Sequence, residues 1–383
     1  MSVNRTLVGS AAAALILAYG ADVRAQGCVA SRIDANVNCP SHDSLAARDT
    51  DGNSYHLKPG RWQASFGYRW FRSHRHFVGS VEQNAANVAN GTAERDRSSS
   101  EVINHVHIPA VSLGYGLSDR VSLGADLPIF IARRKSPGNA TRPMDRTEAR
   151  GIGDLTLAAR YWVGNPKGFA SQNLQVGLGI KAPTGNDKVE DDFLVRLDSV
   201  TGAPITERRP VDQSIQPGDG GWGLYAEFQA FKAFGRVTAF ASGNYLSNPR
   251  EQNDWYRNPT ATTQDPISGK LSICDQYAGR VGLGTGFGKL GLSLGARLEG
   301  VPSSDLIGGD LGRRRPGYSV AIEPGVSYSF GKTAVNLSVP YLVRRVRTQN
   351  ISDKLASIES GHKENGDAAF ADYVVMVGFS RRF

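Results

Sequence analysis

The stretch FADYVVMVGFSRRF, residues 370–383, decides the fold of this chain. Successive side chains of a β-strand point to opposite faces, so one largely apolar and aromatic face collects Tyr373, Val375, Val377, Phe379, Arg381 and Phe383. An apolar strand at the edge of a soluble sheet recruits other chains. A closed barrel in lipid has no edge, and it needs an apolar outer face with aromatic residues at the membrane interface. The stretch therefore predicts a transmembrane barrel, against the alternative of a terminal strand in a soluble sandwich.

Similar alternating stretches precede this terminal strand. They are expected at residues 61–71, 106–117, 121–131, 151–163, 174–182, 222–230, 236–246, 277–287, 290–298, 318–330 and 335–343. The connections between them alternate between long and short without exception. A soluble sandwich has no reason to sort its loops in this way, whereas outer-membrane barrels have short periplasmic turns and long extracellular loops.

The fold class that follows is all-β: a closed antiparallel transmembrane β-barrel of about 12 strands, formed by residues 58–383 and located in the bacterial outer membrane. The mean hydropathy is only −0.32. This low value is compatible with a transmembrane barrel, because only alternate residues of its strands face lipid. A last strand that ends in Phe383 also resembles the C-terminal assembly signal of such barrels. This resemblance implies the barrel-assembly machinery as a partner, beside the lipid of the outer membrane.

The first 25 residues form a separate segment. They contain one basic residue near the start, Arg5, and then an apolar run that is too short to span a bilayer. Small residues precede Gln26, as in a cleavage site. This pattern predicts a secretory signal peptide at residues 1–25, which is removed from the mature chain.

Residues 26–57 are polar and lack periodicity, so we expect a periplasmic N-terminal segment or a plug at the mouth of the barrel. Cys28 and Cys39 lie close enough in sequence to close a local disulfide ring in an oxidising compartment. The third cysteine, Cys274, is an alternative partner for either of them.

Charged residues fall on the face of the strands opposite to the apolar one. A Lys or Arg side chain that faces lipid near the midplane costs about 2–4 kcal/mol, so these groups are expected to point into the lumen. The candidate lumen or constriction residues are Arg69, Asp126, Asp154, Arg160, Lys181, Glu227, Arg280, Arg297, Glu299, Glu323 and Arg344. They form either a structural ion-pair network or a polar path for solutes. In the second case, Asp154, Arg160 and Lys181 are expected to make a charged constriction.

The long connections are basic, and the net charge of the chain is +8. The basic positions are Arg133, Arg134, Lys135, Arg142, Arg146, Arg150, Arg208, Arg209, Arg313, Arg314 and Arg315. At the outer rim, such residues are expected to meet the phosphates of lipopolysaccharide. Nucleic acid is not expected as a partner, because the chain contains no recognition motif for it.

No catalytic site, cofactor or metal is expected. The neighbouring residues His42, Asp43 and Ser44 do not make a triad, which requires geometry across separate elements. The i, i+2 pair of His74 and His76, and the similar pair at residues 105 and 107, are expected to point outward at the outer interface. They leave metal binding open as a weaker alternative.

Three short motifs carry a resemblance to a known family. They are GIGD at residues 151–154, KAPTG at residues 181–185 and PGDG at residues 217–220. These motifs are similar to a strand start, a strand end and a strand entry in the outer-membrane transporter family of the phenol meta-cleavage degradation pathway. The resemblance implies a barrel and the uptake of aromatic or other small hydrophobic compounds.

The expected function is therefore an outer-membrane channel or transporter that passes a small-molecule solute through a charge-lined lumen. One alternative is a closed structural or adhesin-like barrel that acts through its basic extracellular loops. A membrane-embedded lipid hydrolase is the enzymatic alternative. It is disfavoured because no strand carries a His followed two positions later by a Ser.

Overall fold

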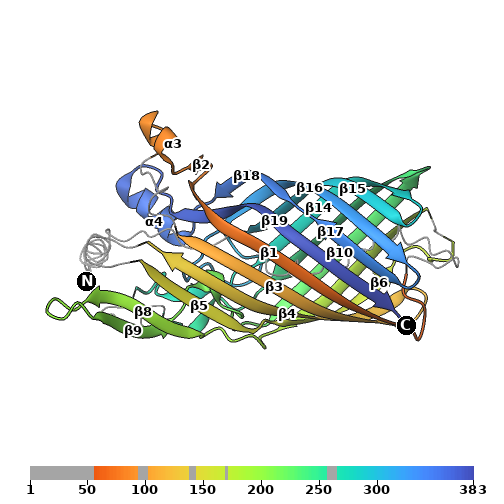
Figure 1. Cartoon of the computed structure of the whole chain (residues 1–383), viewed down its shortest axis with the longest axis horizontal. Helices are drawn as coiled ribbons and strands as arrows, with labels where there is room; N and C mark the ends of the chain where they lie inside the picture. The colour runs from red at the N-terminus through yellow and green to blue at the C-terminus, as the bar shows by residue number, and fades with distance from the viewer. Residues whose placement is uncertain (1–55, 94–101, 138–143, 169–170, 257–264) are drawn as a thin grey trace, which may run out of the picture.

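The alternation of side chains along the sequence produces a closed antiparallel β-barrel in the computed structural model, with loops gathered at one end (Figure 1). The structure describes residues 56–93, 102–137, 144–168, 171–256 and 265–383. Within these ranges, the helices are too short and too polar to traverse a bilayer.

Twelve wall strands can be followed through the described residues, two of them interrupted. They are β1 (Trp62–Val78), β3 (Ile103–Gly116), β4 (Val121–Ser136), β5 (Asp145–Ile152) continued by β6 (Leu155–Trp162), β7 (Gln172–Ala182), β10 (Gly223–Phe234), β11 (Val237–Ser247), β14 (Gln276–Phe287), β15 (Leu290–Val301), β16 (Gly317–Phe330), β17 (Thr333–Ser338) continued by β18 (Tyr341–Arg347), and β19 (Asp367–Arg382). Neighbours in sequence pair in space, and β19 pairs with β1 to close the barrel. The predicted fold class is thus confirmed.

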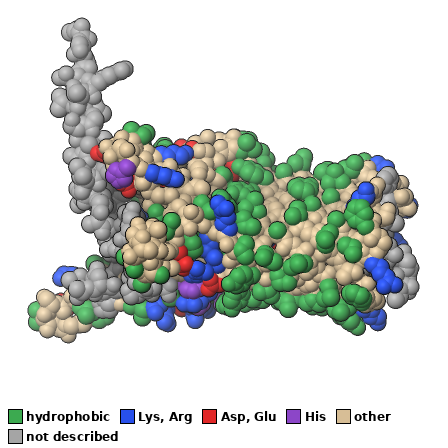
Figure 2. Space-filling view, turned by 90° about the horizontal axis from the view of Figure 1, so that it is seen from above, with side chains coloured by type: hydrophobic (Ala, Val, Ile, Leu, Met, Phe, Trp, Pro, Cys, Tyr) green, Lys and Arg blue, Asp and Glu red, His purple; other side chains and the backbone are tan. Residues whose placement is uncertain are grey.

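Many apolar side chains are exposed on the outside of the wall, and on the face that Figure 2 shows they form a broad band, in green. Along β15, for example, Leu290, Leu292, Leu294 and Leu298 are all exposed, while Arg297 between them is buried. A barrel that exposes this much apolar surface is stable only in lipid. The chain is therefore an integral membrane barrel, as predicted, with the C-terminus at the end that carries the short turns (Figure 1).

The long connections contain more regular structure than the sequence predicts. The basic stretch at residues 133–150, expected as a loop, is largely a ladder between β4 and β5. The other additional elements are β2 (Val81–Glu82), α3 (Ala85–Ala89), β8 (Glu190–Leu197), β9 (Pro204–Pro210), the short 3₁₀ helix η1 (Gln213–Ile215), β12 (Gln252–Tyr256), β13 (Lys270–Ser272) and α4 (Ile351–Ser360). Outside lipid, both faces of a strand can be polar, so the alternation that marks a strand disappears there.

The inward direction predicted for Arg344 is wrong. Val339 and Pro340 interrupt the strand between β17 and β18, because proline has no N–H to donate to the ladder. The register of pairing with β16 is the same on both sides of this break, but it shifts by one residue at Val343, so Arg344 is exposed while Arg345 is buried. Arg345 donates from Nε to the carbonyl oxygen of Ala371 over 2.8 Å.

The outward direction predicted for His76 is also wrong. The pairing of β1 with β19 shifts register between Phe71 and Arg75, and His76 becomes buried. Its Nε2 accepts from the backbone N–H of Val102 over 3.0 Å, and its Nδ1 lies 3.4 Å from Asp367. The described residues contain no cluster of three or more metal-ligating side chains.

Several predictions fall on residues outside those that the structure describes. These are the signal peptide at residues 1–25, most of the segment 26–57 and the disulfide between Cys28 and Cys39. Cys274, the only cysteine among the described residues, is buried just before β14, and this burial raises the pKa of its thiol.

Candidate functional site: the barrel lumen

Inward-facing side chains divide the lumen into three levels. An apolar level lies on the side of the long loops, a network of ion pairs lies in the middle, and a polar cavity lies toward the short turns. Each level draws on strands from different parts of the wall, so it forms only when the barrel closes.

The middle level is an ion-pair network that crosses the lumen. Arg69 of β1 reaches Glu299 of β15 over 2.5 Å between Nη2 and Oε2, although other strands separate β1 from β15 in the wall. Arg297 lies 3.2 Å from Glu299 and 2.7 Å from Glu323 of β16. Arg280 of β14 lies 3.2 Å from Glu323. All these side chains are at most 9% exposed, so the network is a buried group of charges inside the barrel, which we call the septum (Arg69, Arg280, Arg297, Glu299 and Glu323).

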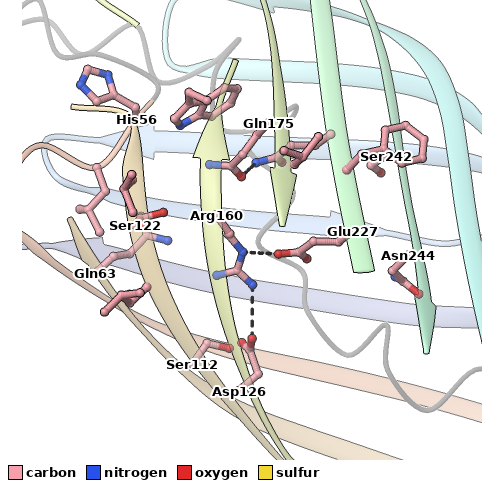
Figure 3. Close-up of a pocket in the computed structure, with 18 of the residues that line it drawn as sticks. His56, Gln63, Ser112, Ser122, Asp126, Arg160, Gln175, Glu227, Ser242 and Asn244 are labelled. Carbon is pink, nitrogen blue, oxygen red and sulfur yellow. Dashed lines mark hydrogen bonds and ion pairs between the residues drawn. The ribbon is translucent and has the colours of Figure 1, made fainter. Parts of the chain in front are cut away.

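On the side of the short turns, the septum borders a polar cavity of about 150 Å³. Figure 3 shows Arg160 of β6 in its wall, between Asp126 of β4 and Glu227 of β10. Its guanidinium pairs with Glu227 and lies 3.5 Å from Asp126, and the hydroxyl of Tyr225 donates to Glu227 over 3.0 Å. Amide and hydroxyl side chains make up much of the remaining lining: Gln63, Ser65, Ser112, Ser122, Gln175, Gln229, Ser242 and Asn244. A cavity with this lining suits water and polar groups.

On the other side of the septum, a packed cluster of buried apolar side chains fills much of the lumen. This cluster, which we call the apolar chamber, is formed by Phe71, Val106, Ile108, Phe130, Leu342, Val374 and Met376 from the wall, with Val211 and Ile215 from the segment around η1. A small cavity of about 20 Å³ lies where the chamber meets the septum, between Phe71, Leu342 and Arg69. The loop that carries η1 therefore folds inward and packs on the inner face of β3 and β4.

An ion-pair latch holds η1 in this position. Asp212, which caps η1, accepts from both terminal nitrogens of Arg315 over 3.1 and 2.8 Å, and it lies 3.7 Å from Arg134 of β4. Burial would raise the pKa of Asp212, but Arg134 and Arg315 outweigh this effect and hold that pKa well below its usual value. Gln213 adds a hydrogen bond of 2.7 Å to the carbonyl of Ser272. The latch thus ties the inserted loop to opposite parts of the barrel mouth.

The three motifs found in the sequence meet at one junction. The ammonium of Lys181 pairs with Asp219 and lies 3.7 Å from Asp154. Asp154 also accepts from the backbone N–H of Gly185 over 3.0 Å. A Cβ atom on Gly218 would lie 2.3 Å from the carbonyl oxygen of Gly185, so the close approach of these two backbones requires glycine there. The motif residues therefore fasten the loops to β5, β6 and β7.

Replacing Lys181 by methionine is expected to lower the free energy of unfolding by about 1.5–3 kcal/mol, the usual worth of hydrogen bonds to charged groups. Asp154 and Asp219 would lose their shared cation, while their backbone hydrogen bonds remain. Urea unfolding in detergent micelles measures the change. Lys167→Met, at an exposed ion pair with Asp119, is the matched control and should leave the midpoint unchanged. A Lys181→Met midpoint equal to that of the control would contradict the structural role of the junction.

Ten of the eleven predicted lumen residues therefore separate into three groups, and Arg344 belongs to none of them. Five of them form the septum. The polar cavity is surrounded by Asp126, Arg160 and Glu227. The junction contains Asp154 and Lys181. The expected trio of Asp154, Arg160 and Lys181 does not come together, because Arg160 pairs with other partners.

Sequence reasoning missed the latch and the cation that replaces Arg344. Asp212, Arg315 and Arg345 all lie in or beside stretches without alternation. The only local signal is the pair Asp212 and Ser214, which is typical of a helix cap.

No protein-family model matches this sequence, and no curated protein matches it either. Among solved structures, the chain is similar to an outer membrane channel from Pseudomonas putida F1, with 15% identity, a TM-score of 0.50 and coverage of 86% of this chain and 97% of that chain. It is also similar to the translocator domain of the autotransporter NalP from Neisseria meningitidis, with 13% identity, a TM-score of 0.44 and coverage of 86% and 90%. A third similar structure is the Pseudomonas putida toluene transporter TodX, with 10% identity, a TM-score of 0.38 and coverage of 94% and 98%.

At these identities, the likeness concerns the fold alone. Together with the apolar outer band, it defines this chain as an outer-membrane β-barrel protein, which confirms the predicted location. Membership of the phenol meta-cleavage transporter family stays a prediction, since it rests only on the three motifs.

Proposed function

We propose that this protein is an outer-membrane channel for small hydrophobic solutes, with aromatic compounds as the substrate class. The observation that carries the proposal is the apolar chamber beneath the outer mouth of the barrel. The lumen of a barrel that passes hydrophilic solutes is polar throughout. Here Phe71, Ile108 and Phe130 offer a dry, aromatic environment instead, which favours an apolar ring over water.

The lower levels of the lumen support a stepwise path. A solute that leaves the apolar chamber meets the septum and then the polar cavity, where amide and hydroxyl groups surround Arg160. Because the charges of the septum are paired, they present less of an electrostatic barrier to an uncharged solute than isolated charges would. The expected role of Arg160 and its partners is thus to line the inner half of the path.

Two substitutions on the same face of β3 test the substrate class. Ile108→Asn places an amide in the apolar chamber, whereas Ser112→Asn places the same group in the polar cavity. A polar group without partners in an apolar site costs about 1–3 kcal/mol, so Ile108→Asn should slow toluene entry about tenfold. Ser112→Asn should change it little.

The measurement is uptake of radiolabelled toluene into cells with an intact lipopolysaccharide leaflet, with and without the protein. Heat-dependent mobility on gels confirms that each variant is folded. Equal uptake by cells with and without the protein, or equal effects of the two substitutions, would remove the support for a hydrophobic channel.

The second candidate function is a closed barrel that acts through its extracellular loops. The inserted segment around η1 and its latch favour it, since they fill the outer mouth of the lumen. Loop deletions that abolish function, while Ile108→Asn leaves it intact, would support this alternative.

A further inference from the structure

The outer face of the first strands changes from apolar to cationic over a few rows of residues. In one row, Trp70 of β1 pairs with His107 of β3, and His107 pairs with Ile131 of β4, which pairs with Arg150 of β5. The next row toward the long loops contains Arg72, His105, Arg133 and Glu148 in the same order. The row beyond it pairs Lys135 with Arg146. Figure 2 shows Lys, Arg and His side chains along the edge of the apolar band.

These residues form an outward surface, which we call the cationic stripe (Arg72, His105, Arg133, Arg146 and Arg150). The side chains of Arg133 and Arg150 are 57% and 63% exposed. Both pair with Glu148, over 2.9 and 3.2 Å, and Asp191 of β8 accepts from the backbone N–H of Glu148 over 2.7 Å. Arg133 and Arg150 thus share a single carboxylate, which leaves an excess of positive charge at this edge.

Strand alternation gives neighbouring arginines opposite roles. Arg134 points into the barrel, is buried and belongs to the latch with Asp212. Arg133 points outward, where lipid surrounds the apolar band. The basic run at residues 133–135 is therefore divided between closing the lumen and facing the membrane surface.

We propose that the cationic stripe binds the phosphate groups of a lipid headgroup in the outer leaflet. Guanidiniums bind phosphate through paired, charge-assisted hydrogen bonds, and several of them lie on adjacent strands. The stripe is continuous with an apolar surface at Trp70, Ile131 and Ile152, against which the acyl chains of the same molecule can lie. This continuity favours a phosphorylated lipid over free phosphate.

Binding of diphosphorylated lipid A to the purified full chain in detergent micelles tests the proposal, with native mass spectrometry as the readout. The double variant Arg133→Gln/Arg150→Gln should bind it about tenfold more weakly, because two charge-assisted contacts are lost. The control is Lys289→Gln/Lys332→Gln, which removes the same charge from two exposed lysines in the short turns at the other end of the barrel. It should bind as the wild type does.

Dephosphorylated lipid A should bind the wild type as weakly as the phosphorylated lipid binds the stripe variant. Equal affinities for the wild type and the stripe variant would overturn the proposal. Competition by millimolar inorganic phosphate that fully displaces the lipid would also overturn it, since the site would then be one for free anions. If the double variant fails to fold, Arg72→Gln on β1 replaces it. This single variant should lose less affinity for the lipid than the double variant, but the loss should be measurable. An unchanged affinity would contradict the proposed role of the stripe.

Discussion

Replacing Asp212 by asparagine is expected to open the outer end of the lumen. The substitution keeps the size of the side chain but leaves Arg134 and Arg315 without their shared carboxylate. Removing one partner from a buried ion pair costs about 3–5 kcal/mol. Here it destabilises the state in which η1 is inserted into the lumen. The equilibrium between inserted and released loop should therefore shift roughly a hundredfold or more toward release.

Single-channel recording in planar bilayers measures this shift as longer or more frequent open periods. Asp198→Asn is the matched control, because Asp198 lies in the exposed turn between β8 and β9 and binds only local groups. It should leave the recordings unchanged. A variant at Asp212 that folds and conducts as the wild type does would show that apolar packing of Val211 and Ile215 holds the loop without the latch.

The latch should also resist acid. The pKa of Asp212 is lowered well below its usual value, because the two arginines outweigh the effect of burial. A folded-state pKa below the unfolded value means that the stabilisation is complete above the ordinary carboxyl pKa, and it is lost only as the pH falls through the lowered one. Between neutral pH and about pH 4, the ordinary range for a carboxyl group, the latch is expected to stay closed.

The wall of the barrel is the part that the sequence predicts well. A strand in lipid must be apolar on its outer face. The sequence of a stretch such as residues 290–298 therefore shows which side chains face lipid and which face the lumen. This constraint ends where the wall leaves lipid, and the ladder between β4 and β5 consequently looked like a loop. It also fails at a bulge: the pairing of β18 with β16 shifts register at Val343, which exchanges the roles of Arg344 and Arg345.

The arrangement of the lumen is harder to predict, because its contacts depend on the closed barrel. Alternation shows that Arg69 and Glu299 both point inward, but it does not show that they meet across the lumen. The latch is even harder to predict from the sequence. Asp212 pairs with Arg134 and Arg315, which are far away in the sequence, and none of these three residues lies in an alternating stretch predicted as a wall strand. Such contacts follow from loop folding, for which the sequence carries only the local capping signal of η1.

Replacing Glu299 by glutamine is expected to destabilise the barrel strongly. Glu299 is the partner of both Arg69 and Arg297 in the septum, and its loss leaves excess positive charge in a buried part of the lumen. The expected decrease in the free energy of unfolding is about 3–5 kcal/mol, measured by urea unfolding in micelles. A matched control is Asp119→Asn, which breaks an exposed ion pair with Lys167 and should change the midpoint little.

A second substitution separates the charge effect from lost packing. Arg69→Met combined with Glu299→Gln removes one charge of each sign, so the balance of the septum returns to its original value. The double variant should recover most of the stability lost in Glu299→Gln, because replacing a whole buried ion pair by uncharged groups is often neutral. If the two losses instead add, the residues act independently, and the septum would be a set of separate contacts rather than one network across the lumen.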